Sequence, residues 1–207
     1  LSLQTADAMV RFGFRDAGYE YVVIDDCWAE KQRKNGRLVP DAEKFPRGIK
    51  ALAEEIHARG LKLGIYSCAG VRTCQNYPGS FDHEFIDAET FAEWGVDFLK
   101  YDYCNLPKTA NGKLLYHRMG NALRACGRDI LFSACNWGEG ESYRWMRGAG
   151  AHMYRSTGDI FDCFVSFRDI AKSQFDFLYA SGPNCFNDMD MLTVGMNGAG
   201  NVGAGGC

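Results

Sequence analysis

The sequence predicts an α/β protein of the (β/α)8 TIM barrel type, and two observations support that prediction. Short apolar runs recur along the 207 residues, each followed by an amphipathic stretch, which is typical of parallel strands joined by helices. Polar residues stand where nearly every predicted strand ends. In a barrel all strands end at one shared mouth, whereas an open doubly wound sheet gathers its ligand at a switch point. The pattern therefore favours the barrel.

The predicted strands are runs of β-branched, aromatic or leucine residues. They cover residues 21–24, 63–66, 98–101, 130–133, 152–155 and 178–180. Between them, apolar residues at spacings of three and four predict helices over 49–56, 115–123 and 164–178. Six such units are two short of a full barrel. We therefore expect strands two to seven, with the first and eighth missing, in one catalytic domain over residues 1–207 that is partial at both ends.

The composition excludes several classes of function. A hydrophobic content of 46% with 14% aromatic residues indicates a folded core. The net charge is −3 and the sequence has no run of Lys or Arg, so neither nucleic acid nor an anionic membrane is an expected partner. No apolar stretch approaches the roughly 18 residues that predict a membrane span. The oligomeric state is left open.

Three patterns that suggest metals or cofactors fail on their context. The nine cysteines include no paired C-x-x-C, which argues against structural zinc, and their odd number requires a free thiol or a partner elsewhere. Residues 187–190, Asn-Asp-Met-Asp, lack the glycine and distal glutamate of an EF-hand. Residues 198–203 match G-x-G-x-x-G, but no helix pattern follows them. We expect no metal and no cofactor.

The segment 99–104 is the most informative of the predicted strand ends. Side chains alternate along a strand, so Lys100 and Asp102 project to the same side, which in a barrel is the mouth. A lysine buried beside Asp102 would keep that carboxylate ionised, as a nucleophile requires. The alternative is a structural ion pair at a strand end.

Two other strand ends carry carboxylates. Asp25 and Asp26 precede Trp28, so they could bind a metal or accept hydrogen bonds from sugar hydroxyls, with the indole offering an apolar face to the ring. The alternative is a turn or helix cap made by one aspartate. Asp159 follows Gly158, which permits a sharp turn, and its alternative role is to cap the next helix.

These stretches together resemble glycoside hydrolase family 27, the group of α-galactosidases (melibiases) and α-N-acetylgalactosaminidases. The resemblance covers nearly the whole chain. The matching segments are residues 17–19, 24–28, 45–48, 60–66, 73–74, 78–80, 94–97, 99–104, 155–159 and 187–192.

The resemblance implies a retaining hydrolase that removes terminal α-linked galactose by double displacement. In it, Asp102 takes the position of the nucleophile and Asp159 that of the general acid/base. Asp25 and Asp26 bind the O4/O6 edge of galactose, and the further sugar-binding positions are Tyr66, Lys100, Asn136, Arg155, Asp190 and Met191.

The resemblance also implies a Cys74–Cys104 disulfide and an unpaired Cys27. A disulfide favours an oxidising compartment, so we expect secretion. The expected partner is a galactoside or galacto-oligosaccharide.

Two departures from the family pattern leave alternatives open. Asn136 stands where many members have glutamate, so the sugar's 2-position, and with it α-N-acetylgalactosaminidase or β-L-arabinopyranosidase activity, stays open. Met189 replaces the usual proline. A catalytically silent sugar-binding barrel is a third alternative, although both Asp102 and Asp159 are present.

Overall fold

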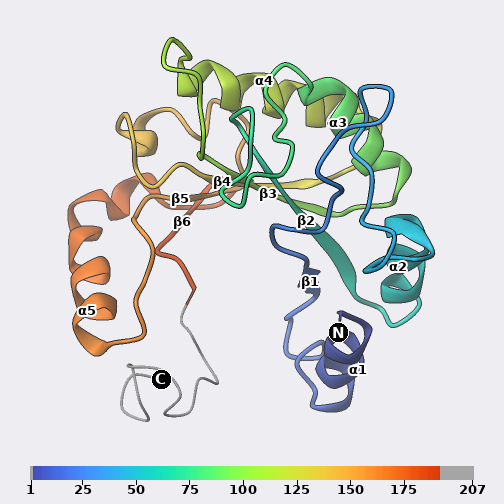
Figure 1. Cartoon of the computed structure of the whole chain (residues 1–207). Coiled ribbons are helices and arrows are strands. Elements are labelled where there is room, and N and C mark those ends of the chain that lie inside the picture. The colour runs from blue at the N-terminus through green and yellow to red at the C-terminus, as the bar shows by residue number, and fades with distance from the viewer. Residues whose placement is uncertain (1, 192–207) are drawn as a thin grey trace.

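The computed structural model describes residues 2–191, which form a curved, six-stranded parallel sheet with the helices along its outer side (Figure 1). The strands pair in sequential order, each with the next along the chain. Sequential parallel order is the order of a barrel wall, whereas a doubly wound sheet reverses direction at its switch point. The predicted fold class is confirmed.

The strands are β1 Tyr21–Val23, β2 Lys62–Cys68, β3 Phe98–Asp102, β4 Leu131–Cys135, β5 Met153–Arg155 and β6 Phe186–Asp188. The α-helices are α1 Ser2–Arg11, α2 Gly48–His57, α3 Glu84–Glu93, α4 Gly112–Ala125 and α5 Phe164–Ser173, and the short 3-10 helices are η1 Ser142–Arg144 and η2 Phe175–Ala180.

One predicted strand is wrong. Residues 178–180 belong to the 3-10 helix η2, and the strand that pairs with β5 is β6, after a turn at 182–185. Leu178 and Tyr179 are exposed, and the ring of Tyr179 packs edge-on against Tyr143. The apolar run therefore serves a surface contact. The true strand ends in the polar pair Asn187 and Asp188, which concealed its strand character.

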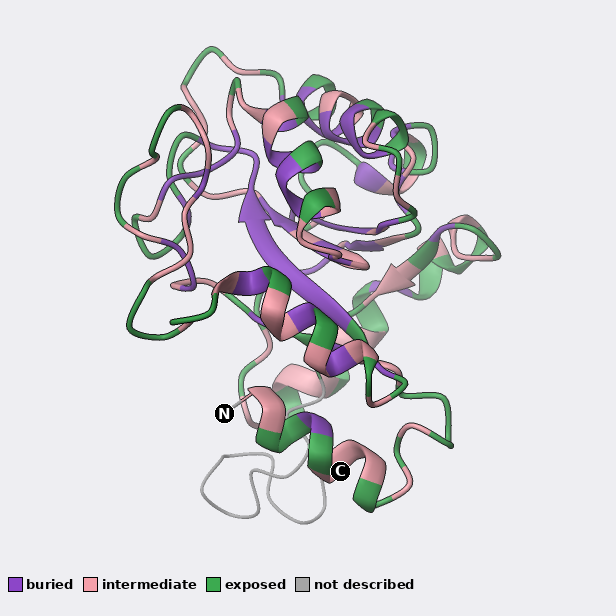
Figure 2. Cartoon of the chain, turned by 90° about the vertical axis from the view of Figure 1, so that its right-hand side faces the viewer, coloured by how far each residue is buried: buried purple, intermediate pink, exposed green. Residues whose placement is uncertain are grey.

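Buried residues concentrate in the strands and on the inward sides of the helices (Figure 2). In β2 every residue after Lys62 is buried. Between β3, β4 and α4, the rings of Tyr101, Tyr116 and Phe132 pack together with centroids 5.3 to 6.2 Å apart. The Tyr116 hydroxyl lies 3.0 Å from the carbonyl oxygens of both Tyr101 and Cys135, which ties helix α4 to the ends of two strands.

Charged side chains contact Asp97, the residue just before the amino-terminal end of β3. Asp97 accepts hydrogen bonds from the Leu63 amide at 2.9 Å and from Arg128 at 2.5 Å, and its other close partner is His57 Nε2 at 2.7 Å. Burial raises the pKa of Asp97, but these bonds outweigh burial and hold it below the ordinary value. Asp97 thus joins α2, β2 and the loop before β4.

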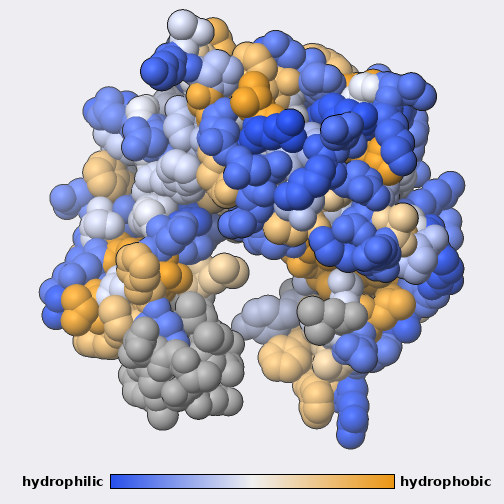
Figure 3. Space-filling view, in the orientation of Figure 1, coloured by the Kyte–Doolittle hydropathy of each residue, from blue (hydrophilic) through white to orange (hydrophobic). Residues whose placement is uncertain are grey.

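The molecule is hollowed between the two ends of the arc of helices, where α1 and α5 lie apart (Figure 3). None of the helices within residues 2–191 is long and apolar enough to cross a membrane.

Candidate active site

The site begins at Asp102, the last residue of β3. Its side chain is buried, and both of its carboxylate oxygens accept a hydrogen bond. The Tyr66 hydroxyl donates to Oδ2 at 2.9 Å, and the Tyr103 amide donates to Oδ1 at 2.9 Å. Burial, followed by the negative charge of Asp102, raises the pKa of Tyr66, so this hydroxyl stays protonated and acts as the donor.

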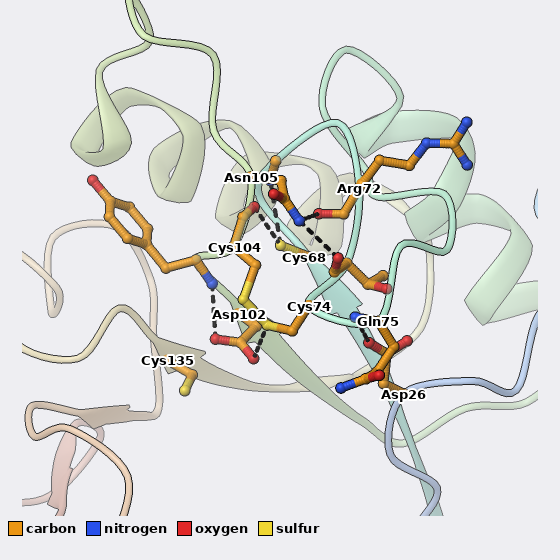
Figure 4. Close-up of a disulfide and its surroundings, with 12 residues drawn as sticks. Asp26, Cys68, Arg72, Cys74, Gln75, Asp102, Cys104, Asn105 and Cys135 are labelled. Atoms are coloured by element: carbon orange, nitrogen blue, oxygen red, sulfur yellow. Dashed lines mark hydrogen bonds between the residues drawn. A yellow bond between two sulfur atoms is a disulfide. The ribbon is translucent and has the colours of Figure 1, made fainter.

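A disulfide lies against the same carboxylate. Cys74 and Cys104 are bonded with their Cα atoms 5.2 Å apart, as predicted, and Cys27 is a free thiol, also as predicted. The Sγ atom of Cys74 lies 3.3 Å from Asp102 Oδ2 and 3.4 Å from the Tyr66 hydroxyl (Figure 4). The disulfide therefore packs directly against the Asp102 carboxylate.

The loops joined by this disulfide are closely packed. The side-chain amide of Asn105 donates through Nδ2 to the Thr73 carbonyl at 2.8 Å. A Cβ atom at Gly70 would lie 2.0 Å from the Cys104 carbonyl oxygen, so only glycine permits this approach. The nearby Cys68 thiol donates to that carbonyl at 3.1 Å (Figure 4). Burial raises the pKa of Cys68 to about 12, which keeps it a thiol and a poor nucleophile toward the disulfide.

Lys100 does not take the partner that the sequence predicted. Its ammonium group donates to Asp25 Oδ2 at 2.8 Å, while the hydrogen bonds to Asp102 come from neutral groups. Burial lowers the pKa of Lys100, but the bond to Asp25 and the charge of Asp102 outweigh burial and raise it. The prediction of an ion pair between Lys100 and Asp102 was therefore wrong, because Lys100 pairs with Asp25.

Asp25 and Asp26 follow β1 and join it to neighbouring loops. Asp25 Oδ1 accepts the Asp26 amide at 2.8 Å, and Asp26 Oδ1 accepts the Cys27 amide at 2.7 Å. Asp26 Oδ2 accepts the Gln75 amide at 3.0 Å, next to the disulfide (Figure 4). The two carboxylates thus make the predicted turn, and Asp26 also joins the segment after β1 to the loop that carries Cys74.

Trp28 is a core residue, so the prediction that its indole faces a sugar was wrong. Only 5% of it is exposed, its ring packs against Trp94, and its Nε1 donates to the Tyr66 carbonyl at 2.8 Å. An indole nitrogen that finds a partner inside the protein allows the whole ring to be buried. The chain turns at Cys27, where φ is +70°, and this turn directs Trp28 into the core.

Arg155 connects two carboxylates at the ends of β5 and β6. Its Nη2 lies 2.5 Å from Asp159 Oδ1 and 3.2 Å from Asp190 Oδ2. The side chains of Arg155 and Asp190 are 8% exposed, whereas that of Asp159 is 79% exposed. Helix α5 begins at Phe164, beyond Asp159, so the alternative of Asp159 as its cap was wrong.

After β4, Asn136 is buried and bonded within its own loop. Its Nδ2 donates to the Glu139 carbonyl at 2.8 Å, and its Oδ1 accepts the Gly138 amide at 3.3 Å. The next residue, Trp137, is partly exposed and packs edge-on against Tyr103 at 5.8 Å. Trp137 is the second residue after β4, and sequence reasoning did not single it out.

The predicted site residues thus lie within a strand or in the loop that follows its carboxyl end. Met191, 66% exposed, is the last residue that the structure describes. Residues 198–203, which carry the glycine pattern, lie outside the described residues. Within residues 2–191, Cys74, Asp102 and Cys104 are the cluster with metal-ligand spacing, but the two sulfurs are bonded to each other and offer no thiolate.

A sequential parallel sheet with carboxylates at its carboxyl end defines a barrel protein with its site at the mouth. A family model described as "Alpha galactosidase A" matches residues 1–202, and the chain belongs to this family.

The chain is 49% identical over 199 residues to an alpha-galactosidase of Oryza sativa subsp. japonica and 45% identical over 201 residues to alpha-galactosidase A of Cellvibrio japonicus. These alignments cover 94% and 92% of this chain but 47% and 49% of the two relatives, so the chain spans about half the length of the curated relatives it matches.

Among solved structures, alpha-galactosidase I from Mortierella vinacea superposes with a TM-score of 0.91 at 38% identity, covering 96% of this chain and 56% of that one. An alpha-galactosidase from Saccharomyces cerevisiae with raffinose superposes with a TM-score of 0.90 at 32% identity, covering 97% of this chain and 49% of that one.

Proposed function

We propose that this chain carries the sugar-binding mouth and both catalytic carboxylates of a retaining α-galactosidase. The observation that supports it best is the setting of Asp102: a buried carboxylate at a strand end, held by two neutral donors. Relatives at 45% and 49% identity are named alpha-galactosidases, and the Saccharomyces cerevisiae enzyme was solved with raffinose, a galactoside.

In the first step Asp102 attacks the anomeric carbon of the galactosyl unit while Asp159 gives its proton to the departing glycosidic oxygen. The products are a galactosyl ester on Asp102 and a free alcohol. In the second step Asp159, now ionised, takes a proton from water, whose oxygen attacks the same carbon and releases Asp102. Two inversions leave the anomeric configuration unchanged, and neither step requires a metal or a cofactor.

The hydrogen bonds to Asp102 suit this role. Hydrogen bonds to a carboxylate are strong even when the donor is neutral. Tyr66 and the Tyr103 amide therefore fix the carboxylate without placing a cation on it, while the Lys100 ammonium group donates its hydrogen bond to Asp25. This setting suits Asp102 as the proposed nucleophile.

We assign sugar recognition to the charged groups around Asp102. Asp25, Asp26 and Lys100 would hold the O4/O6 edge of galactose, and Arg155, Asp190 and Met191 would contact it from the opposite side of the mouth. Asn136 would act at the 2-position by shaping the loop that carries Trp137, since its own amide group is bonded within that loop.

The test is an assay of the full-length polypeptide on nitrophenyl α-galactoside, α-N-acetylgalactosaminide and β-L-arabinopyranoside, with proton NMR of the first sugar released. Hydrolysis of the α-galactoside with α-galactose as first product is expected. Preference for the α-N-acetylgalactosaminide or the β-L-arabinopyranoside would favour the corresponding alternative activity. Release of β-galactose as first product would exclude a retaining mechanism. Tight galactose binding without turnover would indicate a catalytically silent barrel.

We also propose that the protein works in an oxidising compartment, since a disulfide in contact with the nucleophile would be reduced in the cytosol. Localisation of a tagged protein in its native cell tests this. Activity confined to a reducing cytosol would contradict it.

A further inference from the structure

The end of β6 contacts both sides of the loop that carries Asp159. Asp190 Oδ2 accepts the backbone amide of Ile160 at 2.8 Å and lies 3.2 Å from Arg155 Nη2. Ile160 is the residue directly after Asp159, and Arg155 forms an ion pair with Asp159. One carboxylate oxygen of Asp190 therefore restrains both the backbone and the charged partner of Asp159.

Asp159 needs such restraint because its own side chain is not packed. It is 79% exposed, whereas Arg155 and Asp190 are each 8% exposed. A general acid must stay within hydrogen-bond reach of the oxygen that it protonates, and exposed side chains lose that geometry readily.

Asp190 is itself fixed to the sheet. Its amide donates to Asp188 Oδ1 at 2.9 Å, and its φ of +82° is the left-handed conformation, which aspartate adopts more readily than most residues. The Asp188 carbonyl accepts the amide of Ser156 at 3.2 Å, at the other end of the same loop. Strand β6 thus holds the loop at Ser156 and at Ile160.

We propose that Asp190 is a positioning residue for Asp159, holding the general acid through the Ile160 amide and the Arg155 guanidinium. This proposal rests on the proposed function and adds to it. As a sugar contact, which the family resemblance implies, Asp190 would act on every galactoside alike. As a positioning residue, it acts most on substrates whose leaving group needs a proton.

The two roles are separated by comparing substrates in the full-length protein. Raffinose has a sugar alkoxide as leaving group and needs acid help, whereas 2,4-dinitrophenyl α-galactoside does not. We expect Asp190→Asn to lower kcat/KM on raffinose at least about tenfold more than on the dinitrophenyl substrate, within the range that general acids contribute. Asp169→Asn, the same change at an exposed residue of α5 paired with Arg168, should leave both unchanged.

An equal loss on the two substrates would overturn the positioning role and leave the proposed function standing. A wild-type protein inactive on all α-galactosides would overturn both. If thermal unfolding shows that Asp190→Asn does not fold, Asp190→Glu serves instead. Asp190→Glu keeps the charge near Arg155 but displaces the carboxylate from Ile160. We therefore expect its activity loss to depend less on the leaving group than that of Asp190→Asn. A loss that does not depend on the leaving group at all would overturn the proposal.

Discussion

Two aspartates mark the two ends of strand β3, and their surroundings differ in kind. Asp97, just before the strand, bonds Arg128, lies against His57 and accepts the Leu63 amide. Asp102, at the other end, accepts a tyrosine hydroxyl and a backbone amide and touches a disulfide. Both carboxylates have their oxygens occupied.

The difference lies in the charge of the donors. A cation beside Asp97 neutralises it and joins three segments of the chain, which serves stability. Neutral donors fix the direction of the Asp102 carboxylate, which suits the nucleophile that we propose. In barrel proteins generally, the carboxyl ends of strands carry the chemistry and the amino ends carry stability. In this chain the two kinds of surroundings lie five residues apart, at the two ends of β3.

The largest effect is expected from the loss of the proposed nucleophile, Asp102. Asp102→Asn should lower kcat on nitrophenyl α-galactoside by about 10³-fold or more, because no group replaces the attacking oxygen. Thermal unfolding should change little, since the amide keeps the shape of the carboxylate. Steady-state kinetics and a melting curve check both expectations. Wild-type turnover in Asp102→Asn would show that Asp102 is not the nucleophile.

Removing the disulfide should affect both properties at once. Cys74→Ser with Cys104→Ser opens a link across 30 residues, which should cost about 2–4 kcal/mol in the free energy of unfolding. Activity should fall as well, because the contact between the disulfide and the Asp102 carboxylate is lost. Urea unfolding and kinetics at low temperature, where both proteins are folded, separate the two effects. A destabilised variant with full activity would show that the disulfide does not support Asp102.

Asp97→Asn should destabilise without altering chemistry. Loss of the charge beside Arg128 should lower the free energy of unfolding by about 2 kcal/mol at pH 7, with kcat unchanged on the folded protein. Because the folded-state pKa of Asp97 is lowered, its stabilisation is present above the unfolded value of about 3.9 and is lost as the pH falls through the folded value.

The same pair of proteins therefore gives a pH test. Melting curves of wild type and Asp97→Asn should lie far apart at pH 7 and converge below about pH 4. A gap that stays constant down to pH 3 would mean that the ionised carboxylate is not what stabilises this end.

The smallest effect is expected from Tyr66→Phe. It removes one of two neutral donors from Asp102, which should cost about 1–1.5 kcal/mol in the transition state, or roughly tenfold in kcat/KM. The remaining bond from the Tyr103 amide keeps the carboxylate in place. Kinetics on nitrophenyl α-galactoside measure this, with Tyr143→Phe, away from Asp102, as the control. A loss as large as that of Asp102→Asn would mean that Tyr66 does more than orient the nucleophile.

The sequence predicts what local patterns determine. Apolar runs placed the first five strands, and the polar residues after them placed Asp25, Asp102 and Asp159 at one end of the sheet. The sixth strand was misplaced because its last two residues are polar and a more apolar segment, η2, lies just before it.

Partner choice within the site was beyond sequence reasoning. Alternation along β3 put Lys100 and Asp102 on one side, but whether the ammonium reaches Asp102 or Asp25 depends on how β1 lies against β2 and β3. The bonds from Asp190 to Ile160 and Arg155 likewise depend on the register of β5 and β6. Such contacts join residues 30 or more positions apart, which no local pattern encodes.

The Tyr116 hydroxyl, bonded to the carbonyl oxygens of Tyr101 and Cys135, sets the distance between two strand ends from outside the mouth. Asp102 directly follows the first carbonyl and Asn136 directly follows the second. Because a helix residue sets this distance, the loops beyond β3 and β4 are free to change in length and composition. Those loops can therefore vary while Asp102 keeps its place at the end of β3.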